Sequence, residues 1–293
     1  MVDAQRMDTA PEQYLGLPTH KLTLPCGDEL RVALHGAHVL SWVAQGRERL
    51  YLSPQSQMDG VAAIRGGVPV CFPQFNQRGA LPKHGFARNL PWVVKSSEAT
   101  AEGVSLTLVL SDSPATRAHW PMAFEARFII DLTPRSLTMT LKVFNRDTQP
   151  LEMTGALHTY LAVDDIAQAR LCGLQGQAEW DSLTNAHAQA APELRFAGEF
   201  DRVYAATVRP LLLQDGAHRL HIEQSETWLN SVVWNPGAAK CAQMADMPAD
   251  GYQHMLCVEA AQVDSPVKIS PQATWQGWQR LTVLQGARSP DRS

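Results

Sequence analysis

Residues 124–145, FEARFIIDLTPRSLTMTLKVFN, decide the fold class of this chain. Apolar side chains recur at every second position on both sides of Thr133-Pro134-Arg135, the spacing that places them on one face of a β-strand. The proline and its neighbours at the centre are typical of a turn. Two alternating runs joined by a short turn predict an antiparallel hairpin.

The same alternation continues through much of the chain and predicts an all-β fold, mainly antiparallel. Further strands are expected at residues 106–111, 211–214, 218–224, 229–235, 254–260 and 278–285. Breaks such as Asn145-Arg146-Asp147 and Asn235-Pro236-Gly237 supply turns between strands. Helical periodicity is scarce, and we expect only a short helix near residues 178–189.

Length and composition predict one globular domain over residues 1–293, with a core from about residue 20 to 285 and polar ends. Of the residues, 45% are hydrophobic and 18% are charged, which is enough apolar material for a large core. The net charge of −4 and the pI near 6.2 argue against nucleic acid as a partner, because binding it requires a broad basic face.

The sequence predicts no association with a membrane. Its start, MVDAQRMDTAPEQYLGL, has no apolar segment behind basic residues, and no stretch of the chain approaches about eighteen uninterrupted apolar residues. We therefore expect a cytoplasmic protein, and we expect it to be monomeric.

The spacing of cysteine and histidine predicts free thiols and no metal centre. The five cysteines are odd in number and lack any C-x-x-C pair. His35/His38 and His218/His221 lie in strand-like sequence, where residues three apart project to opposite faces and cannot grip one ion without a bend. The common nucleotide-binding and serine-hydrolase motifs are absent.

Residues 60–97 contain no Asp or Glu and predict a pocket for an anion. The segment is rich in Gly and Pro, so we expect a structured loop system that carries fixed positive charge. Arg65 and Arg88 lie near its two ends and have no acidic neighbour in sequence, which favours a role in gripping phosphate or carboxylate. Arg78 and Lys95 are expected to be solvated.

Two further residues of this segment precede a glycine. Lys83 and His84 stand directly before Gly85, whose backbone freedom could bring both side chains toward a ligand. A tight turn with exposed side chains is the alternative.

Three residues elsewhere are candidates for chemistry. His158 is a titratable ring in the apolar run MTGALHTYLAV, where it is either a functional group or a satisfied core histidine. Glu259 ends the apolar run HMLCVE, either buried for a purpose or at a strand end that meets water. Asp201 either accepts hydrogen bonds from a polyol or starts a strand. The eight tryptophans could stack against a sugar, but large aromatic residues in strands are more often part of the core. We assign none of them to sugar binding.

Six short segments carry a family resemblance through their content and order. They are RGGVPVCFPQF (65–75), KHGFAR (83–88), LHTYL (157–161), DRVY (201–204), VWNPG (233–237) and MLCVE (255–259). Together they resemble the hexose-6-phosphate mutarotases, the glucose-6-phosphate 1-epimerase branch of the aldose 1-epimerase superfamily. The resemblance covers about residues 20 to 285.

The resemblance implies a single galactose-mutarotase-like β-sandwich whose concave sheet carries the active site, with neither a metal nor an organic cofactor. It implies that His158 and Glu259 are catalytic, that Arg65 and Arg88 contact the phosphate and the substrate, and that Asp201 binds substrate. Position 83 departs from the family, which often has glutamine there, and Lys83 could add charge to the phosphate site.

Two other departures affect loop shape. The chain has Phe75-Asn76 where Phe-Gly is usual, and Ala260-Ala261 where Pro-Gly is usual.

The implied function is that of an isomerase that interconverts the α and β anomers of aldohexose 6-phosphates, with glucose 6-phosphate as its small-molecule substrate. Two alternatives stay open: an aldose 1-epimerase for unphosphorylated galactose or glucose, and a sugar-phosphate-binding protein without catalysis. The acid-free segment argues against the first, and the presence of both His158 and Glu259 argues against the second.

Overall fold

Three antiparallel sheets form the fold in the computed structural model, which describes residues 11–284. Every pairing between the named strands of this range is antiparallel, as the alternating sequence predicted. Of the predicted polar ends, residues 1–10 and 285–293 lie outside the described residues, whereas residues 12–14 and 17–19 form strands that begin before the expected start of the core near residue 20.

The largest sheet contains the hairpin on which the fold prediction rests. Its nine strands, in spatial order, are β16 (Glu193–Leu194), β13 (Arg170–Cys172), β18 (Leu211–Asp215), β19 (His218–Gln224), β22 (Thr274–Val283), β10 (Ser136–Asn145), β9 (Phe124–Thr133), β8 (Val104–Ser111) and β7 (Val93–Ala99). β9 and β10 pair without interruption from Thr133 opposite Ser136 to Phe124 opposite Asn145. The predicted turn is confirmed: Arg135 adopts φ +65° after Pro134.

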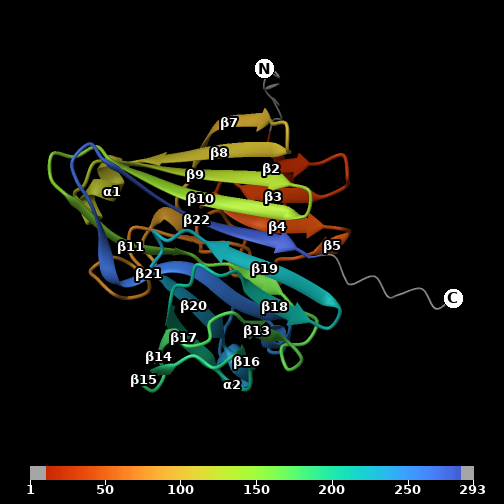
Figure 1. Cartoon of the computed structure of the whole chain (residues 1–293). Helices are drawn as coiled ribbons and strands as arrows, with labels where there is room; N and C mark the ends of the chain where they lie inside the picture. The colour runs from red at the N-terminus through yellow and green to blue at the C-terminus, as the bar shows by residue number, and fades with distance from the viewer. Residues whose placement is uncertain (1–10, 285–293) are drawn as a thin grey trace.

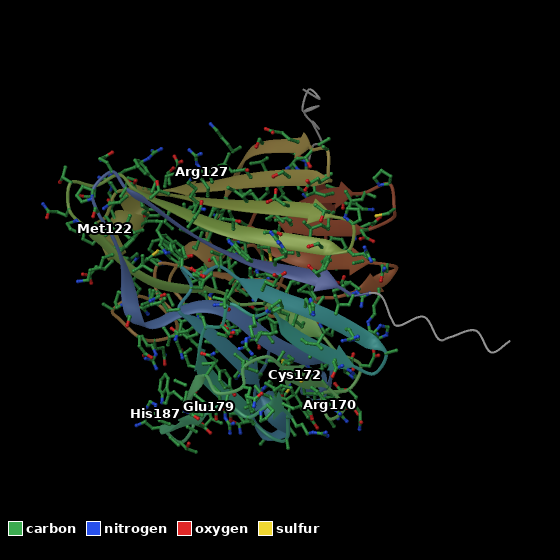
Figure 2. All side chains as sticks on the ribbon, in the orientation of Figure 1. Met122, Arg127, Arg170, Cys172, Glu179 and His187 are labelled. Atoms are coloured by element: carbon green, nitrogen blue, oxygen red, sulfur yellow. The ribbon has the colours of Figure 1, made fainter. Side chains whose placement is uncertain are left out.

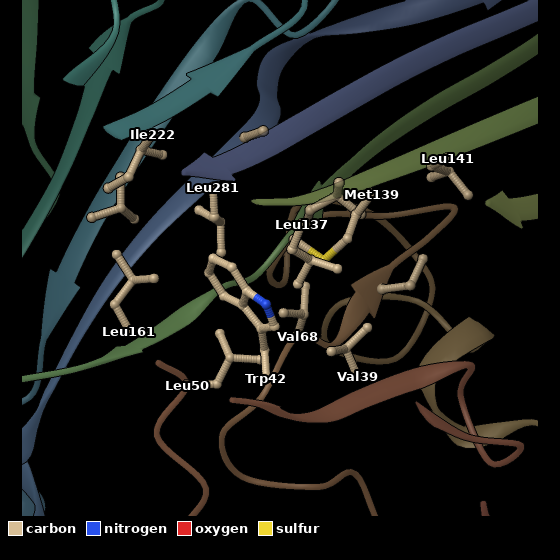
Figure 3. Close-up of a cluster of buried hydrophobic side chains, with 14 of the residues drawn as sticks. Val39, Trp42, Leu50, Val68, Leu137, Met139, Leu141, Leu161, Ile222 and Leu281 are labelled. Carbon is tan, nitrogen blue, oxygen red and sulfur yellow. The ribbon is translucent and has the colours of Figure 1, made fainter. Parts of the chain in front are cut away.

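A five-stranded sheet packs behind the nine-stranded one (Figure 1). Its strands are β1 (Glu12–Tyr14), β2 (Leu17–Thr23), β3 (Glu29–Ala33), β4 (His38–Ala44) and β5 (Arg47–Glu48). Figure 3 shows Trp42 of β4 among side chains from the opposing sheet, including Met139 and Leu281. These side chains are fully buried, so the apolar faces of the two sheets meet in one continuous core.

The third sheet lies beside this sandwich and carries the site described below. Its strands, in spatial order, are β15 (Ala186–Gln189), β14 (Ala178–Asp181), β17 (Phe200–Ala205), β20 (Asn230–Asn235), β21 (Met255–Ile269), β11 (Leu151–Leu157) and β6 (Val70–Cys71), while β12 (Tyr160–Ala162) also pairs with β21. The strands expected from the sequence at 229–235 and 254–260 are therefore confirmed as β20 and the start of β21. Those expected at 106–111, 211–214, 218–224 and 278–285 correspond to β8, β18, β19 and β22.

The helix expected at residues 178–189 is wrong: the segment forms the hairpin β14–β15. The physical reason is its centre, where the Asp181 carboxylate accepts hydrogen bonds from the backbone N–H groups of Leu183 and Thr184. Asn185 then takes φ +60°, a conformation that closes a turn and interrupts a helix. His187 projects from this hairpin at the edge of the molecule (Figure 2).

The helices of the described range are all short. They are the α-helices α1 (Pro114–His119) and α2 (Gly237–Cys241) and the 3₁₀ helices η1 (Ala87–Asn89) and η2 (Gly251–His254). Between residues 11 and 284, none has the length and hydropathy that a membrane-crossing helix requires. All five cysteines have free thiols, as predicted.

Candidate active site

A cavity lies over one face of the third sheet, closed on one side by the loops of the acid-free segment. It encloses about 810 Å³, including open solvent at its mouth. All seven residues singled out from the sequence line it: Arg65, Lys83, His84, Arg88, His158, Asp201 and Glu259. Residues from five separate parts of the chain thus converge on one hollow.

Strand register places His158 opposite Glu259. Leu157 of β11 pairs with Ala260, and Tyr160 of β12 pairs with Cys257, so the two residues between them continue the same register along β21. Residues directly opposite each other in an antiparallel pair project to the same face of the sheet. His158 Nε2 accordingly lies 3.4 Å from Glu259 Oε1.

Burial controls the protonation of this pair. It raises the pKa of Glu259 well above the ordinary value, and the nearby Asp201 carboxylate raises it further. Burial also lowers the pKa of His158 well below its ordinary value, with His84 and the cations Arg65 and Arg88 acting in the same direction. Both groups therefore favour their neutral forms, and a proton held by the pair resides on Glu259.

The pair is also incompletely hydrogen-bonded. His158 Nδ1 and Glu259 Oε2 are buried and have no partner within the described protein. Buried polar groups without partners are rare in packed cores and concentrate at functional sites. This observation favours a functional role for both residues. The alternatives were that His158 is a fully hydrogen-bonded core residue and that Glu259 is a strand end exposed to water.

His84 forms a second wall of the site, against His158. The two rings meet edge to face with centroids 5.4 Å apart. His84 Nδ1 accepts the backbone N–H of Asn76 at 3.2 Å, so the neutral ring carries its proton on Nε2. Burial, assisted by Arg88 and Lys83, lowers the pKa of His84 to about 2. It is thus a neutral hydrogen-bond donor.

Gly85 makes this position of His84 possible. Gly85 has φ +71°, and a Cβ atom there would collide with the backbone carbonyl of Phe72. His84 itself adopts φ +66° and is 6% exposed, whereas Lys83 is exposed at the rim. Of the two readings left open by the sequence, the structure supports the one in which both side chains reach the cavity.

Arg65 differs from the sequence-based expectation because it has an acidic partner. Its Nε and Nη2 lie 3.1 and 2.9 Å from Asp246 Oδ2, and its Nη1 donates to the Tyr160 hydroxyl at 3.0 Å. Asp246 is 181 residues away, so the lack of a local acid did not exclude an ion pair. The side chain nonetheless remains in the cavity wall.

Arg88 and Lys83 are the cations of the site without such a partner. Arg88 Nη2 donates to the Lys83 carbonyl at 2.9 Å, which joins the two ends of the KHGFAR segment. Among residues 11–284, no carboxylate forms a salt bridge with either side chain. Burial, Arg65 and Arg88 lower the pKa of Lys83, which indicates crowded positive charge at this end of the cavity.

Asp201 lies across the cavity, at the second position of β17. Burial raises its pKa despite a hydrogen bond with Ser182 and the nearby Lys240. Asp201 thus lies near the start of a strand, as one reading of the sequence expected, and its largely buried carboxylate also lines the cavity.

Sequence reasoning missed several residues of the rim. Arg78, which was expected to be solvated, stacks on Trp180 at 4.4 Å and pairs with Asp264, whereas Lys95 is exposed as expected. Trp180 was missed because residues 178–189 were expected to form a helix. In the structure Trp180 lies on strand β14 and lines the cavity. Trp234 and Lys240 also line the cavity, and no periodic signal distinguishes them from core and surface residues.

One group in the site has the composition of a metal centre. Ligand atoms of His158, Cys257 and Glu259 lie within 4.8 Å of one another. Burial raises the pKa of the Cys257 thiol well above its usual value, and the cations Arg65, Lys83 and Arg88 surround the cavity. A cysteine binds a metal ion as its thiolate, and burial keeps the Cys257 thiol protonated. This environment therefore disfavours a bound metal cation.

Comparison with known proteins gives consistent matches across most of the chain. The model of the aldose 1-epimerase family matches residues 18–282. A protein of Escherichia coli K12 named "Putative glucose-6-phosphate 1-epimerase" is 39% identical over 245 residues, 81% of each chain. A protein of the same name from Cenchrus ciliaris is 33% identical over 265 residues, covering 86% of this chain and 80% of the relative.

A solved structure agrees in fold. The crystal structure titled as that of a putative mutarotase (YeaD) from Salmonella typhimurium superposes with a TM-score of 0.83 and 31% identity. The match covers 94% of this chain and 97% of that one. The fold class expected from the resemblance is therefore confirmed.

Proposed function

Because the chain belongs to the aldose 1-epimerase family, we propose that it interconverts the α and β anomers of aldohexose 6-phosphates, with glucose 6-phosphate as its substrate. The observation that carries this proposal is the His158–Glu259 pair facing one cavity with two cations, Lys83 and Arg88, that no carboxylate of the described residues neutralises. The pair supplies acid and base, and the cations supply a site for a dianion.

Ring opening needs one proton removed from the C1 hydroxyl and one delivered to the ring oxygen. Glu259 as carboxylate takes the first, and His158 as imidazolium gives the second. Burial leaves the shared proton on Glu259 at rest, so transfer across the 3.4 Å between Oε1 and Nε2 produces the reactive form. Positioned acids and bases each contribute about 10²- to 10⁴-fold in rate.

Ring closure reverses the two transfers. After opening, Glu259 holds the C1 proton and His158 is neutral, the forms that burial favours. Rotation about the C1–C2 bond then presents the other face of the aldehyde to the C5 hydroxyl. His158 removes the proton of that hydroxyl and Glu259 returns its own to the C1 oxygen, so the opposite anomer forms and the pair regains its starting state.

The remaining groups hold the sugar in place. Arg88 and Lys83, together with Arg65, bind the phosphate end, which does not react and so contributes binding and orientation. Asp201 accepts hydrogen bonds from sugar hydroxyls, and His84 donates its Nε2–H to a sugar oxygen. Neither His84 nor Asp201 needs to change protonation in this scheme.

The direct test is anomer exchange measured by NMR. Exchange rates are compared for glucose 6-phosphate, galactose 6-phosphate, mannose 6-phosphate and free glucose at equal enzyme concentration. We expect fast exchange for at least one hexose phosphate and much slower exchange for glucose. Faster exchange for free glucose would favour an aldose epimerase, and no enzyme-dependent exchange would favour a binding protein.

We further propose that the chain acts as one domain, as a monomer and in the cytoplasm. The site residues from Arg65 to Glu259 come from five separate parts of the chain, which supports a single folded unit. Light scattering of the purified protein tests the monomer, and a dimer mass would contradict it.

A further inference from the structure

The Arg65 guanidinium, although it lines the cavity, is held by two protein side chains. Of its five N–H donors, Nε and one on Nη2 face Asp246 Oδ2, and one on Nη1 donates to the Tyr160 hydroxyl. Two N–H groups remain for a ligand. The guanidinium is therefore fixed in orientation before any substrate binds.

The backbone around this ion pair is tied together by one buried residue. Ser53 N–H donates to the Arg65 carbonyl at 3.0 Å, and Ser53 Oγ donates to the Asp246 carbonyl at 2.7 Å. Ser53 is 2% exposed. The segment that carries Asp246 lies between α2 and η2, so Ser53 links two loops that are far apart in sequence.

The far side of Arg65 leads to the reacting pair. Tyr160, which accepts the Arg65 hydrogen bond, stacks on His158 with ring centroids 4.8 Å apart and planes 9° from parallel. A continuous set of contacts thus runs from Asp246 through Arg65 and Tyr160 to His158. Among the described residues, the other two arginines of the cavity wall are held differently: Arg88 has no carboxylate partner, and Arg78 pairs with the exposed Asp264 and lies over Trp180 rather than over a residue that contacts His158.

We propose that Asp246 is a positioning residue of this enzyme: it fixes the Arg65 guanidinium against Tyr160 and thereby sets the contact that Arg65 makes with a bound sugar phosphate. Asp246 does not line the cavity and acts only through Arg65. The inference rests on the proposed hexose-phosphate function.

The pair differs from an ordinary surface salt bridge. The Arg65 and Asp246 side chains are 27% and 33% exposed, so solvent screens them less than the exposed pairs whose loss is usually small. Loss of the carboxylate would leave the guanidinium free to change rotamer. A misplaced guanidinium would weaken the charge-assisted contact to the phosphate end and so weaken substrate binding.

A double-mutant cycle tests the proposal. Arg65→Ala, Asp246→Asn and the double variant are compared for KM and kcat on glucose 6-phosphate. We expect Asp246→Asn to raise KM about tenfold while kcat changes less, because a charge-assisted contact to substrate is misplaced. The double variant should match Arg65→Ala within about twofold, because Asp246 has no effect once Arg65 is gone. Asp246→Glu, which keeps the charge, should recover part of the KM.

A matched control comes from the same rim. Asp264→Asn removes the partner of Arg78 and should leave KM within about twofold of the wild type. Thermal melts of each variant establish folding, and Asp246→Glu takes the place of Asp246→Asn in the cycle if the latter does not fold. An unchanged KM in Asp246→Asn, or losses that multiply in the double variant, would overturn the inference.

Failure of the proposed function would look different. In that case the wild type would show no anomer exchange with any sugar phosphate. The cycle is then read from binding of glucose 6-phosphate, followed by the fluorescence of Trp180 and Trp234 in the cavity. The same non-additivity in Kd is expected, and additive losses would again overturn the proposal.

Discussion

Replacing Arg88 by alanine is expected to separate recognition of the phosphate from the chemistry at C1. Arg88 contributes a guanidinium that no carboxylate neutralises within residues 11–284, and its only protein hydrogen bond there goes to the Lys83 carbonyl. The substitution leaves the reacting pair, His158 and Glu259, in place, and Arg88 contributes less than burial, His84 and Arg65 to the lowered pKa of His158. We therefore expect a loss specific to phosphorylated substrates.

The magnitude follows from the number of contacts removed. A hydrogen bond between charged groups contributes about 1.5–3 kcal/mol, and about 1.4 kcal/mol corresponds to tenfold in kcat/KM. One such contact to a phosphate dianion gives a decrease of about 10- to 150-fold for glucose 6-phosphate. For free glucose the decrease should stay below about threefold, since it makes no such contact.

The assay is anomer exchange by NMR on both substrates with the same enzyme preparation. Lys83→Gln serves as a companion variant, because Lys83 bears the other unpaired charge and lies exposed at the rim. We expect the same selectivity with a smaller loss. Equal fractional losses on glucose and glucose 6-phosphate in Arg88→Ala would refute the assignment of the phosphate end.

Three further outcomes are expected. His158→Asn and Glu259→Gln should each reduce turnover at least about 10²-fold on phosphorylated and free sugar alike while the melting temperature changes little; near-normal exchange in either would exclude it from proton transfer. His38 and His84 have pKa values of about 3 and about 2 in the fold, against 6.5 ordinarily. The unfolded chain therefore binds more protons below pH 6.5, and stability should fall with acidification by up to about 1.4 kcal/mol per pH unit for each. Urea unfolding at a series of pH values measures this, and a midpoint independent of pH would contradict it. Gly85→Ala should lower the free energy of unfolding by at least about 1–2 kcal/mol, since alanine would adopt a left-handed conformation and meet a backbone carbonyl; a stability equal to wild type in the same urea assay would be inconsistent with that strain.

Local sequence patterns predicted most of the sheet structure. The alternation in residues 124–145 is the direct consequence of one buried face, and the resulting β9–β10 pairing is regular over its whole length. The same approach failed at residues 178–189, where β15 is exposed throughout and its alternating apolar residues, Ala186 and Ala188, are too small to indicate a buried face. There the turn chemistry of Asp181 and Asn185 was the stronger signal.

The candidate site was predictable in its residues but not in its internal partnerships. His158, Glu259 and the arginines were found because each is a polar group in an unusual sequence context. The Arg65–Asp246 pair joins segments that only the folded chain brings together, and no local pattern marks it. Trp180 was missed for a different reason: its place beside the cavity depends on the β14–β15 hairpin, which was mistaken for a helix.

The single register that residues 155–162 keep along β21 has a consequence for how such a site can diverge. Inserting one residue directly before His158 would move it by one position in the register along β21 and so turn the imidazole toward the opposite face. Loops at the mouth are free of that restriction and can lengthen or shorten. Substrate preference can therefore change during evolution through these loops. The proton-transfer step instead requires that the number of residues between the paired strand positions and His158 stays the same.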